Sequence, residues 1–192
     1  MDVKKKLVKK ATKLMNIENV VKPISLFQDL ANIQIHFTFK WGTCLSEEEF
    51  AWVFELFEKN MRGMYQISKW GYNEISKRQE LRATTSRYII VKNEDHKPIA
   101  YLHYRFVIEF DSAVLYCYEI QVEKDYQAKG VGSALLSIAE CIGKKVSMEK
   151  LMATVFAFNG ASLAFFHKNG FTVDSSCPDE GDYLILCKSL SA

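Results

Sequence analysis

The chain has 192 residues, of which 48% are hydrophobic and 13% aromatic, and its formal net charge is +2. This apolar content is far above that of disordered proteins and is enough for one domain with a substantial core. The nearly neutral charge gives no support for direct nucleic-acid binding. No run of about 18 apolar residues predicts a membrane span. The lysine-rich N-terminus lacks the apolar stretch of a secretion signal, so secretion is not expected.

The five cysteines are scattered along the chain and form no Cys-x-x-Cys pair. An odd number of isolated cysteines, with no histidine grouped beside them, is typical of reduced thiols in the cytosol or nucleus. We therefore expect no metal site.

The first predicted element covers residues 3–15, where apolar residues recur at helical spacing among six lysines. Two interpretations stay open: an amphipathic helix that packs on the domain, or a basic segment for partner binding or nuclear targeting. Residues 33–40 then alternate as a strand does. Ser46 and Glu49 form the capping box of a helix whose apolar stripe runs over residues 50–65.

The rest of the chain alternates between helices and strands. The predicted elements are a helix over 73–82, a hairpin of strands 88–91 and 99–109, a strand over 114–123, a helix over 133–145, a strand over 150–158, a helix over 159–169, and short strands over 171–173 and 183–189. This order predicts an α/β fold, with a mixed central sheet of about seven strands and helices on both faces. We expect residues 1–30 to form an N-terminal helical extension packed on a domain of residues 31–192.

A glycine-containing turn, Gln127-Ala128-Lys129-Gly130-Val131-Gly132, connects the predicted strand over 114–123 to the predicted helix over 133–145. Glycines let the backbone approach a ligand closely, and the free N–H groups at a helix start bind phosphate oxygens. The spacing fits neither the three-glycine dinucleotide fingerprint nor the Walker loop. The turn therefore predicts a phosphate site of another kind.

This turn resembles the Gln/Arg-x-x-Gly-x-Gly/Ala loop of the GNAT acetyltransferases. A second signature of that family is similar to Asn159-x-x-Ser162-x-x-Phe165-Phe166, followed by Gly170-Phe171. The resemblance implies the GNAT fold, with acetyl-CoA as co-substrate and no metal. The cofactor-binding residues that it implies are Ile120, Gln121, Val122, Gln127, Ala128, Lys129, Gly130, Val131, Gly132, Ser133, Asn159 and Phe166. Many members have a tyrosine as general acid where this chain has Phe166, so an acid is not expected there.

The strand that leads into the glycine loop carries the candidate catalytic residues, Tyr118 and Glu119. Its C-terminal half is expected beside the thioester, where Glu119 can take a proton from an incoming ammonium, directly or through a water. Strict alternation along a strand would place Tyr118 and Glu119 on opposite faces. We therefore expect a β-bulge here, as GNAT folds typically have.

Three further segments look like those of the NatD-type N-terminal acetyltransferases, which are selective for histone four and histone two-A. They are Leu115-Tyr116-Cys117-Tyr118-Glu119, the run over residues 60–71, and His103-x-Arg105-Phe106. The resemblance implies direct acetyl transfer, in a ternary complex, to a free N-terminus that reads Ser-Gly-Arg-Gly. The substrate-binding residues that it implies are Tyr65, Trp70, Val107, Ile108, Glu109, Tyr116, Tyr118, Thr154 and Tyr183.

Val107 departs from this family, which has an acidic residue at that position for arginine recognition. Glu109 lies two residues along on the same strand face, and we expect it to bind the substrate arginine alone or with Asp111. The acidic run over residues 179–182 is expected near the same edge, although an ordinary solvated loop is an equal alternative.

Two other functions stay open: a GNAT enzyme for lysine side chains or small amines, and a catalytically silent module that binds acetyl-CoA or histones. A ping-pong route through Cys117 is disfavoured because no histidine base is near it in the sequence. We expect histone N-terminal tails as partners, with no direct contact to nucleic acid or membrane. We also expect a monomer without an auxiliary subunit, in the nucleus and cytoplasm, as the substrate suggests.

Overall fold

A central sheet of eight strands organises the part of the chain that the structure describes. The computed structural model describes residues 3–21, 27–30 and 33–190. The strands are β1 (Phe27–Leu30), β2 (Ile33–Trp41), β3 (Arg87–Asn93), β4 (Pro98–Glu109), β5 (Ser112–Val122), β6 (Lys150–Phe156), β7 (Thr172–Val173) and β8 (Tyr183–Ser189). The helices are α1 (Val3–Thr12), α2 (Ile17–Val21), α3 (Glu47–Ile67), α4 (Glu74–Leu81), α5 (Val131–Lys145) and α6 (Gly160–Lys168).

The strand order is β1-β2-β3-β4-β5-β6-β8-β7. Neighbouring strands are antiparallel except β5 and β6, which run parallel. A parallel pair requires a crossover connection, and α5 provides it. The predicted fold class, an α/β fold with a mixed sheet, is confirmed.

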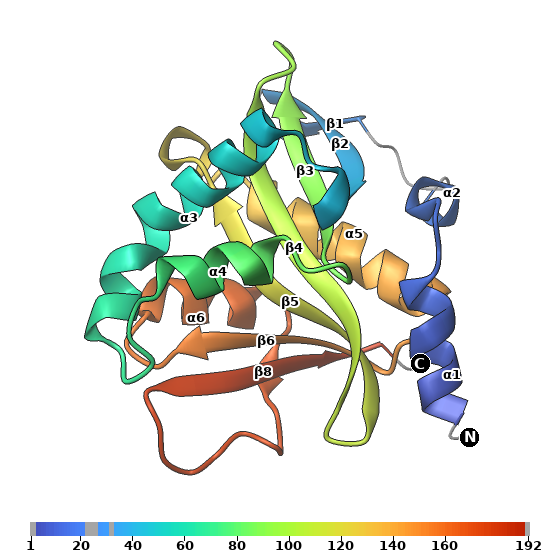
Figure 1. Ribbon diagram of the computed structural model, residues 1–192, viewed down its shortest axis with the longest axis vertical. Helices are drawn as coiled ribbons and strands as arrows, with labels where there is room; N and C mark the ends of the chain where they lie inside the picture. The colour runs from blue at the N-terminus through green and yellow to red at the C-terminus, as the bar shows by residue number, and fades with distance from the viewer. Residues whose placement is uncertain (1–2, 22–26, 31–32, 191–192) are drawn as a thin grey trace.

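Helices cover both faces of this sheet (Figure 1). α3 and α4 lie on one face, over a cluster that includes Phe57 and Tyr101. α5 lies on the other face, together with α1 and α6, whose Ala11 and Phe166 belong to the main core. The helices on both faces that the sequence predicts are therefore present.

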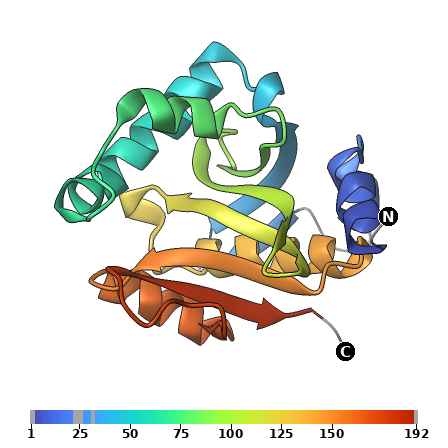
Figure 2. The same cartoon turned by 60° about the horizontal axis from the view of Figure 1, so that its bottom comes forward.

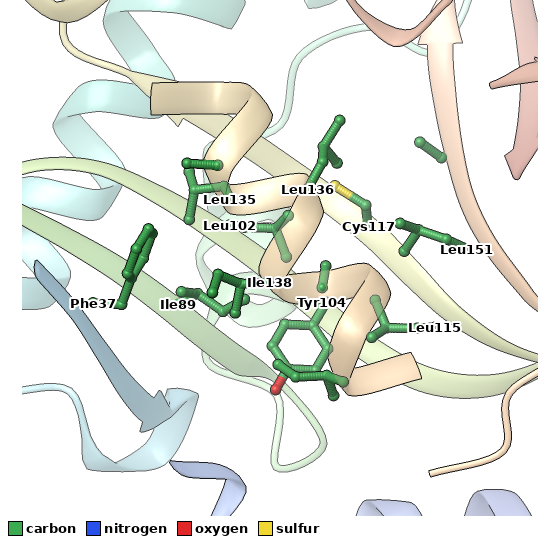
Figure 3. Close-up of a cluster of buried hydrophobic side chains, with 14 of the residues drawn as sticks. Phe37, Ile89, Leu102, Tyr104, Leu115, Cys117, Leu135, Leu136, Ile138 and Leu151 are labelled. Carbon is green, nitrogen blue, oxygen red and sulfur yellow. The ribbon is translucent and has the colours of Figure 1, made fainter. Parts of the chain in front are cut away.

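The main core fixes α5 against the centre of the sheet. Leu135 and Ile138 of α5 are fully buried in one cluster with Leu102 of β4 and Leu115 of β5 (Figure 3). Burying side chains of this size stabilises the fold by about 1.5–3 kcal/mol each. The loop that enters α5 is consequently held at a defined place beside β5.

The start of α3 follows the predicted capping box. Ser46 Oγ accepts from the Glu49 N–H at 3.1 Å, and Glu49 Oε2 accepts from the Ser46 N–H at 3.0 Å. These two bonds satisfy donors that a helix start leaves unpaired. α3 then runs to Ile67, and the chain turns back at Gly71, whose φ is +69°.

The N-terminal segment is fastened to the domain by Arg87 of β3. Its Nη2 donates to the carbonyls of Thr12 at 3.0 Å and Leu14 at 2.6 Å, where α1 ends. A cation is favourable at this end of a helix. α1 packs on the domain, as the first of the two interpretations expected.

The segment Phe27–Leu30 lies within the region where we expected helix, but it is strand β1. It pairs with β2 in a hairpin, with Leu30 opposite Ile33. Four residues are too few to show an alternating pattern, and pairing with β2 decides their conformation. The predicted boundary between residues 30 and 31 adjoins residues 31–32, which lie outside the described residues, and it stays a prediction.

Candidate active site

The parallel strands β5 and β6 pair over only part of their length. Their register runs from Val114 opposite Lys150 to Cys117 opposite Ala153, after which β5 continues to Val122 and β6 to Phe156. Figures 1 and 2 show the two strands diverging. The edge of β5 that faces β6 is therefore open beyond Cys117, and an extended ligand can pair with it as an added strand.

The predicted β-bulge lies in β5. His103 of β4 pairs with Glu119, but the next residue, Tyr104, pairs with Cys117, so the register skips Tyr118. The extra residue reverses the alternation and brings Tyr118 and Glu119 to the same face. The Tyr118 ring accordingly lies 5.3 Å from the ring of His103, the residue directly opposite Glu119.

Glu119 lies at the floor of a pocket, with 5% of its surface exposed. Lys77 Nζ donates to its Oε1 at 3.0 Å, and Gln121 Nε2 donates to its Oε2 at 2.8 Å. Burial raises the pKa of Glu119, and Lys77 partly opposes this effect. Lys77 is not among the residues predicted from the sequence, because nothing around it there distinguishes it from an ordinary solvated helix lysine.

The glycine loop has the conformation of an anion-binding turn. Ala128 and Gly130 have φ of 58° and 89°, and helix α5 begins immediately afterwards. Alternating left-handed residues turn successive N–H groups to one side. Gln127 is exposed, and its Nε2 donates to the Val122 carbonyl at 3.1 Å, which ties the loop to β5.

The first turn of α5 presents backbone donors. Its hydrogen-bond ladder begins with the Ala134 N–H, which donates to the Gly130 carbonyl at 2.9 Å. The N–H groups of Val131, Gly132 and Ser133 precede that ladder, and Gly130 has no side chain to cap them. These donors, with the positive end of a 15-residue helix, suit the pyrophosphate of CoA.

α6 and its N-cap contribute to the lining of the same pocket. Asn159 is its N-cap and accepts from the Ser162 N–H at 3.1 Å, and both residues line the pocket. Phe166 also lines it and is buried against Phe171, with ring centroids 5.0 Å apart. No described hydrogen bond involves the Asn159 amide nitrogen, which leaves it for a ligand.

An aromatic wall closes the substrate side of the pocket. The rings of Tyr65 and Trp70 lie 5.1 Å and 5.2 Å from that of Phe156. Trp70 also lies 5.0 Å from Tyr183, yet it stays 50% exposed. The structure thus brings together three of the predicted substrate residues: Tyr65 from α3, Trp70 from the loop after it and Tyr183 from β8.

Two more predicted residues, Tyr116 and Thr154, meet through their hydroxyl groups. Burial raises the pKa of Tyr116 to about 12, so its phenol stays protonated at neutral pH. The ring lies 5.3 Å from that of Tyr118. This part of the site therefore offers neutral hydroxyl groups and aromatic faces.

The predicted substrate-binding residues on β4 differ in where their side chains lie. Glu109 is half-buried, and its charge adds to burial in raising the pKa of Tyr116. Val107 packs in an apolar cluster beside Tyr116. Ile108 is not at the pocket, because its side chain packs in the main core on the opposite face.

The outer carboxylates have structural partners. Asp111 does not join Glu109, because it lies in the hairpin turn with its carboxylate 3.8 Å from Lys4 of α1, on the other face of the sheet. Asp182 accepts from the Lys69 N–H at 2.6 Å and joins the loop after α3 to the loop before β8. Glu123 accepts from Trp52 Nε1 at 3.0 Å.

The buried thiol and imidazole beside the site are neutral. Burial, and then the charge of Glu119, raises the pKa of Cys117, so its thiolate is scarce. His103 is fully buried, accepts or donates a hydrogen bond with Ser86 at 2.9 Å, and has a pKa that burial lowers well below the usual value. This agrees with a packing and hydrogen-bonding role.

The described ranges contain no group of three or more His, Cys, Asp or Glu residues placed to hold a metal ion. Within the same residues, no helix has the length and hydropathy needed to cross a bilayer.

An open strand edge beside a helix start with free N–H groups is an arrangement that can hold the pantetheine arm and the pyrophosphate of an acyl-CoA. The sequence pattern of the acetyltransferase (GNAT) family matches residues 27–171. The chain therefore belongs to the GNAT family of acetyltransferases, which take their acetyl group from acetyl-CoA.

Solved structures of low sequence identity share this fold. The ribosomal-protein-S18-alanine N-acetyltransferase from Escherichia coli is 18% identical, covers 81% of this chain and 95% of its own, and has a TM-score of 0.56. The NatC complex bound to Gag peptide and CoA gives 18% identity, coverages of 81% and 99%, and a TM-score of 0.58. The PaiA N-acetyltransferase from Thermoplasma acidophilum, in complex with coenzyme A, is 19% identical. Its match covers 80% of this chain and 98% of the PaiA chain, with a TM-score of 0.59.

Proposed function

We propose that this GNAT acetyltransferase is an N-terminal α-amino acetyltransferase of the NatD type. Its substrates would be histone four and histone two-A, whose N-termini read Ser-Gly-Arg-Gly. The observation that carries the proposal is the bulge in β5, which places Tyr118 and Glu119 on one face of the strand, in a pocket walled by Tyr65 and Trp70. Among the neighbours in fold, the E. coli enzyme named for ribosomal protein S18 alanine and the NatC complex with its peptide act on or bind polypeptides.

The cofactor side of the site fits acetyl-CoA. The N–H groups of Val131, Gly132 and Ser133 would hold the pyrophosphate, and the open edge of β5 at Ile120 and Gln121 would pair with the pantetheine arm. The amide nitrogen of Asn159 would be a further hydrogen-bond donor to the cofactor. Acetyl-CoA, when bound, supplies the acetyl thioester.

Glu119 would accept a proton from the ammonium of the substrate serine, directly or through a water. An α-amino group has an unperturbed pKa of about 7.7–8.0, against about 10.4 for lysine, so a carboxylate in the pocket deprotonates it more easily. The neutral amine is then the nucleophile. Cys117 keeps its proton, so we expect no acetyl-enzyme. Phe166 has no proton to give to the departing thiolate.

Recognition of the substrate arginine would rest on Glu109. It lies on the same face as Tyr116 and is half-buried, which strengthens an ion pair with a guanidinium. Val107 cannot contribute a charge, and Asp111 is turned towards Lys4. Because a single carboxylate carries this contact, we expect arginine recognition to be weaker than where two are present.

The remaining features of the proposal follow from this substrate. The partners would be histone N-terminal tails, bound by a monomer that needs no auxiliary subunit and does not contact nucleic acid or membrane directly. The protein would reside in the nucleus and the cytoplasm.

The test is acetyl transfer from acetyl-CoA to a Ser-Gly-Arg-Gly-Lys peptide, followed by mass spectrometry. We expect one acetyl group on the free α-amine and none on the same peptide with a blocked N-terminus. Acetylation of the blocked peptide would instead identify a lysine acetyltransferase. An arginine-to-alanine peptide measures the contribution of Glu109.

The protein itself provides two further controls. Glu119→Gln should lower turnover strongly and leave acetyl-CoA affinity nearly unchanged, and an unaffected rate would remove Glu119 as the base. A stable acetyl group on Cys117, after incubation with acetyl-CoA alone, would contradict the direct mechanism.

A further inference from the structure

Lys77 is a buried cation in direct contact with the candidate base. It projects from α4, has 7% of its surface exposed, and places Nζ 3.0 Å from Glu119 Oε1. The same nitrogen lies 2.7 Å from Glu80 Oε1 and 3.0 Å from the Tyr65 hydroxyl. The three donors of the ammonium group are thus matched by three acceptors, which fixes the position of Lys77.

The opposite oxygen of Glu119 is held as well. Gln121 Nε2 donates to Oε2 at 2.8 Å, and Gln121 Oε1 accepts from Asn60 Nδ2 at 3.0 Å. The orientation of the Gln121 amide is therefore set by Asn60 of α3. The carboxylate of Glu119 is clamped from α4 on one side and, through Gln121, from α3 on the other.

Neither member of the Lys77–Glu119 pair would keep its charge alone at this depth. An isolated carboxylate or ammonium that is removed from water becomes neutral rather than staying ionised. Each charge here compensates the other, and removing one partner of such a pair leaves an uncompensated buried charge. A base must be ionised to accept a proton, so the presence of Lys77 bears directly on the chemistry.

We propose that Lys77 is a positioning residue that keeps Glu119 ionised and aimed into the pocket. The inference rests on the proposed role of Glu119 as the base. Lys77 does not relay the proton: burial lowers its pKa, but the charges of Glu119 and Glu80 outweigh burial and raise it. The ammonium therefore cannot accept a proton from Glu119, and it acts only through the carboxylate.

The other titratable groups around the pair do not replace Lys77. Those that face it are Tyr65 of α3, Glu80 of α4, Tyr88 of β3, Tyr101, His103 and Arg105 of β4, and Cys117 of β5. Burial raises the pKa of the tyrosines and the thiol and lowers that of His103, so these groups are uncharged at neutral pH. Arg105 is engaged elsewhere, with its Nη2 donating to the Glu80 carbonyl and its guanidinium over the Tyr118 ring.

The variant Lys77→Met removes the charge and keeps much of the apolar stem. Burial then acts on Glu119 with only the Gln121 hydrogen bond still lowering its pKa, so the pKa of this carboxyl should rise above its native value. On its acid side, the pH profile of kcat/KM for the Ser-Gly-Arg-Gly-Lys peptide should move to higher pH with it. If the pKa rises by about one, kcat/KM falls by about fivefold at the native pKa and by about tenfold at pH values well below it. Lys77→Arg keeps the charge and should leave both titrations near their native pH.

The ionisation of Glu119 can be measured without any substrate. Carbon-13 NMR of the glutamate carboxyl carbons follows the titration, and the Glu119 signal is identified by its loss in Glu119→Gln. The matched control is Lys150→Met, because Lys150 also pairs with a buried carboxylate, Asp174 at 2.6 Å, but lies outside the pocket. Lys150→Met should lower the stability of the protein without shifting the NMR titration of Glu119 or the acid side of the kcat/KM profile. If Lys77→Met does not fold, Lys77→Gln, which retains a donor to Glu119, is measured in its place.

An unchanged Glu119 titration and an unchanged acid limb in folded Lys77→Met, or in Lys77→Gln measured in its place, would overturn the inference. A change of the same size in Lys150→Met would also overturn it, since the effect would then follow from loss of stability. The NMR titration distinguishes failure of the proposed function from failure of the proposed role of Lys77. If the native enzyme does not acetylate the peptide, the proposed function fails, and the NMR result still decides whether Lys77 controls Glu119.

Discussion

Gly132→Ala tests whether the glycine loop depends on the close approach of α6. Gly132 lies in the first turn of α5, and a Cβ there would meet the Phe165 ring at 3.0 Å and 3.1 Å. Phe165 is itself held against Phe166, with ring centroids 5.2 Å apart. The Phe165 ring, α6 or the start of α5 must therefore move by a few tenths of an ångström.

The magnitude follows from comparing two helical glycines. Alanine gains about 1 kcal/mol over glycine in a helix, and overpacking costs about 1–3 kcal/mol. Gly63 of α3 is exposed and a Cβ there would meet nothing within 4 Å, so Gly63→Ala should show the gain alone. The difference between the two variants isolates the steric cost, about 1–3 kcal/mol. In a chain of this size, each kcal/mol shifts Tm by about 2–4 °C.

The assay combines thermal unfolding with acetyl-CoA titration by calorimetry. We expect Gly63→Ala to unfold at a higher temperature than Gly132→Ala and to bind acetyl-CoA as the native protein does. Gly132→Ala should bind several-fold more weakly, because the N–H groups of the first turn are displaced from the pyrophosphate. Equal Tm values and equal affinities for the two variants would refute the reasoning.

Three further predictions concern stability. Arg87→Met removes the hydrogen bonds to the carbonyls at the end of α1 and should lower the free energy of unfolding by about 1.5–3 kcal/mol. Amide hydrogen exchange should accelerate in α1 while acetyl-CoA binding persists. Unchanged exchange in α1 would contradict the role of Arg87 in docking this helix. Burial raises the pKa of Asp174, but hydrogen bonds from Lys150 and Ser176 outweigh it and lower the pKa below its usual range. The stability that Asp174 adds is therefore fully present above about pH 4 and is lost as the pH falls towards its lowered folded pKa, so urea unfolding should separate native protein from Asp174→Asn fully at pH 7 and progressively less as the pH is lowered below about 4. Phe110 and Asp111 form a two-residue turn with φ of 45° and 58°, and replacing them with Asn-Gly should stabilise the protein by about 1–2 kcal/mol; a lower Tm would argue against strain in this turn.

Much of the fold follows from local patterns. The helix that begins after Ser46, the hairpin of β3 and β4, and the last strand over residues 183–189 all lie where periodicity and caps predicted them. These elements are long or strongly patterned, so their neighbours in the sequence suffice to define them. β1 was missed because its four residues form a strand only through pairing with β2.

The sequence alone was enough to predict the candidate cofactor side of the site. Gln127 to Gly132 and Asn159 to Phe171 are continuous segments in which backbone geometry and helix starts would do the binding, so residue type and spacing are enough to predict them. Their contacts with acetyl-CoA, and the histone specificity, stay predictions.

Only the tertiary structure decided what surrounds the candidate base. Glu119 could be named from its strand, and its bulge could be expected, but its partner Lys77 lies 42 residues earlier on a polar helix. The side chain of Ile108 lies on the opposite face of the sheet, and Asp111 is drawn to Lys4 of α1. These outcomes depend on which charged groups become buried when α1 and α4 pack on the sheet. The local sequence around each residue does not indicate this packing.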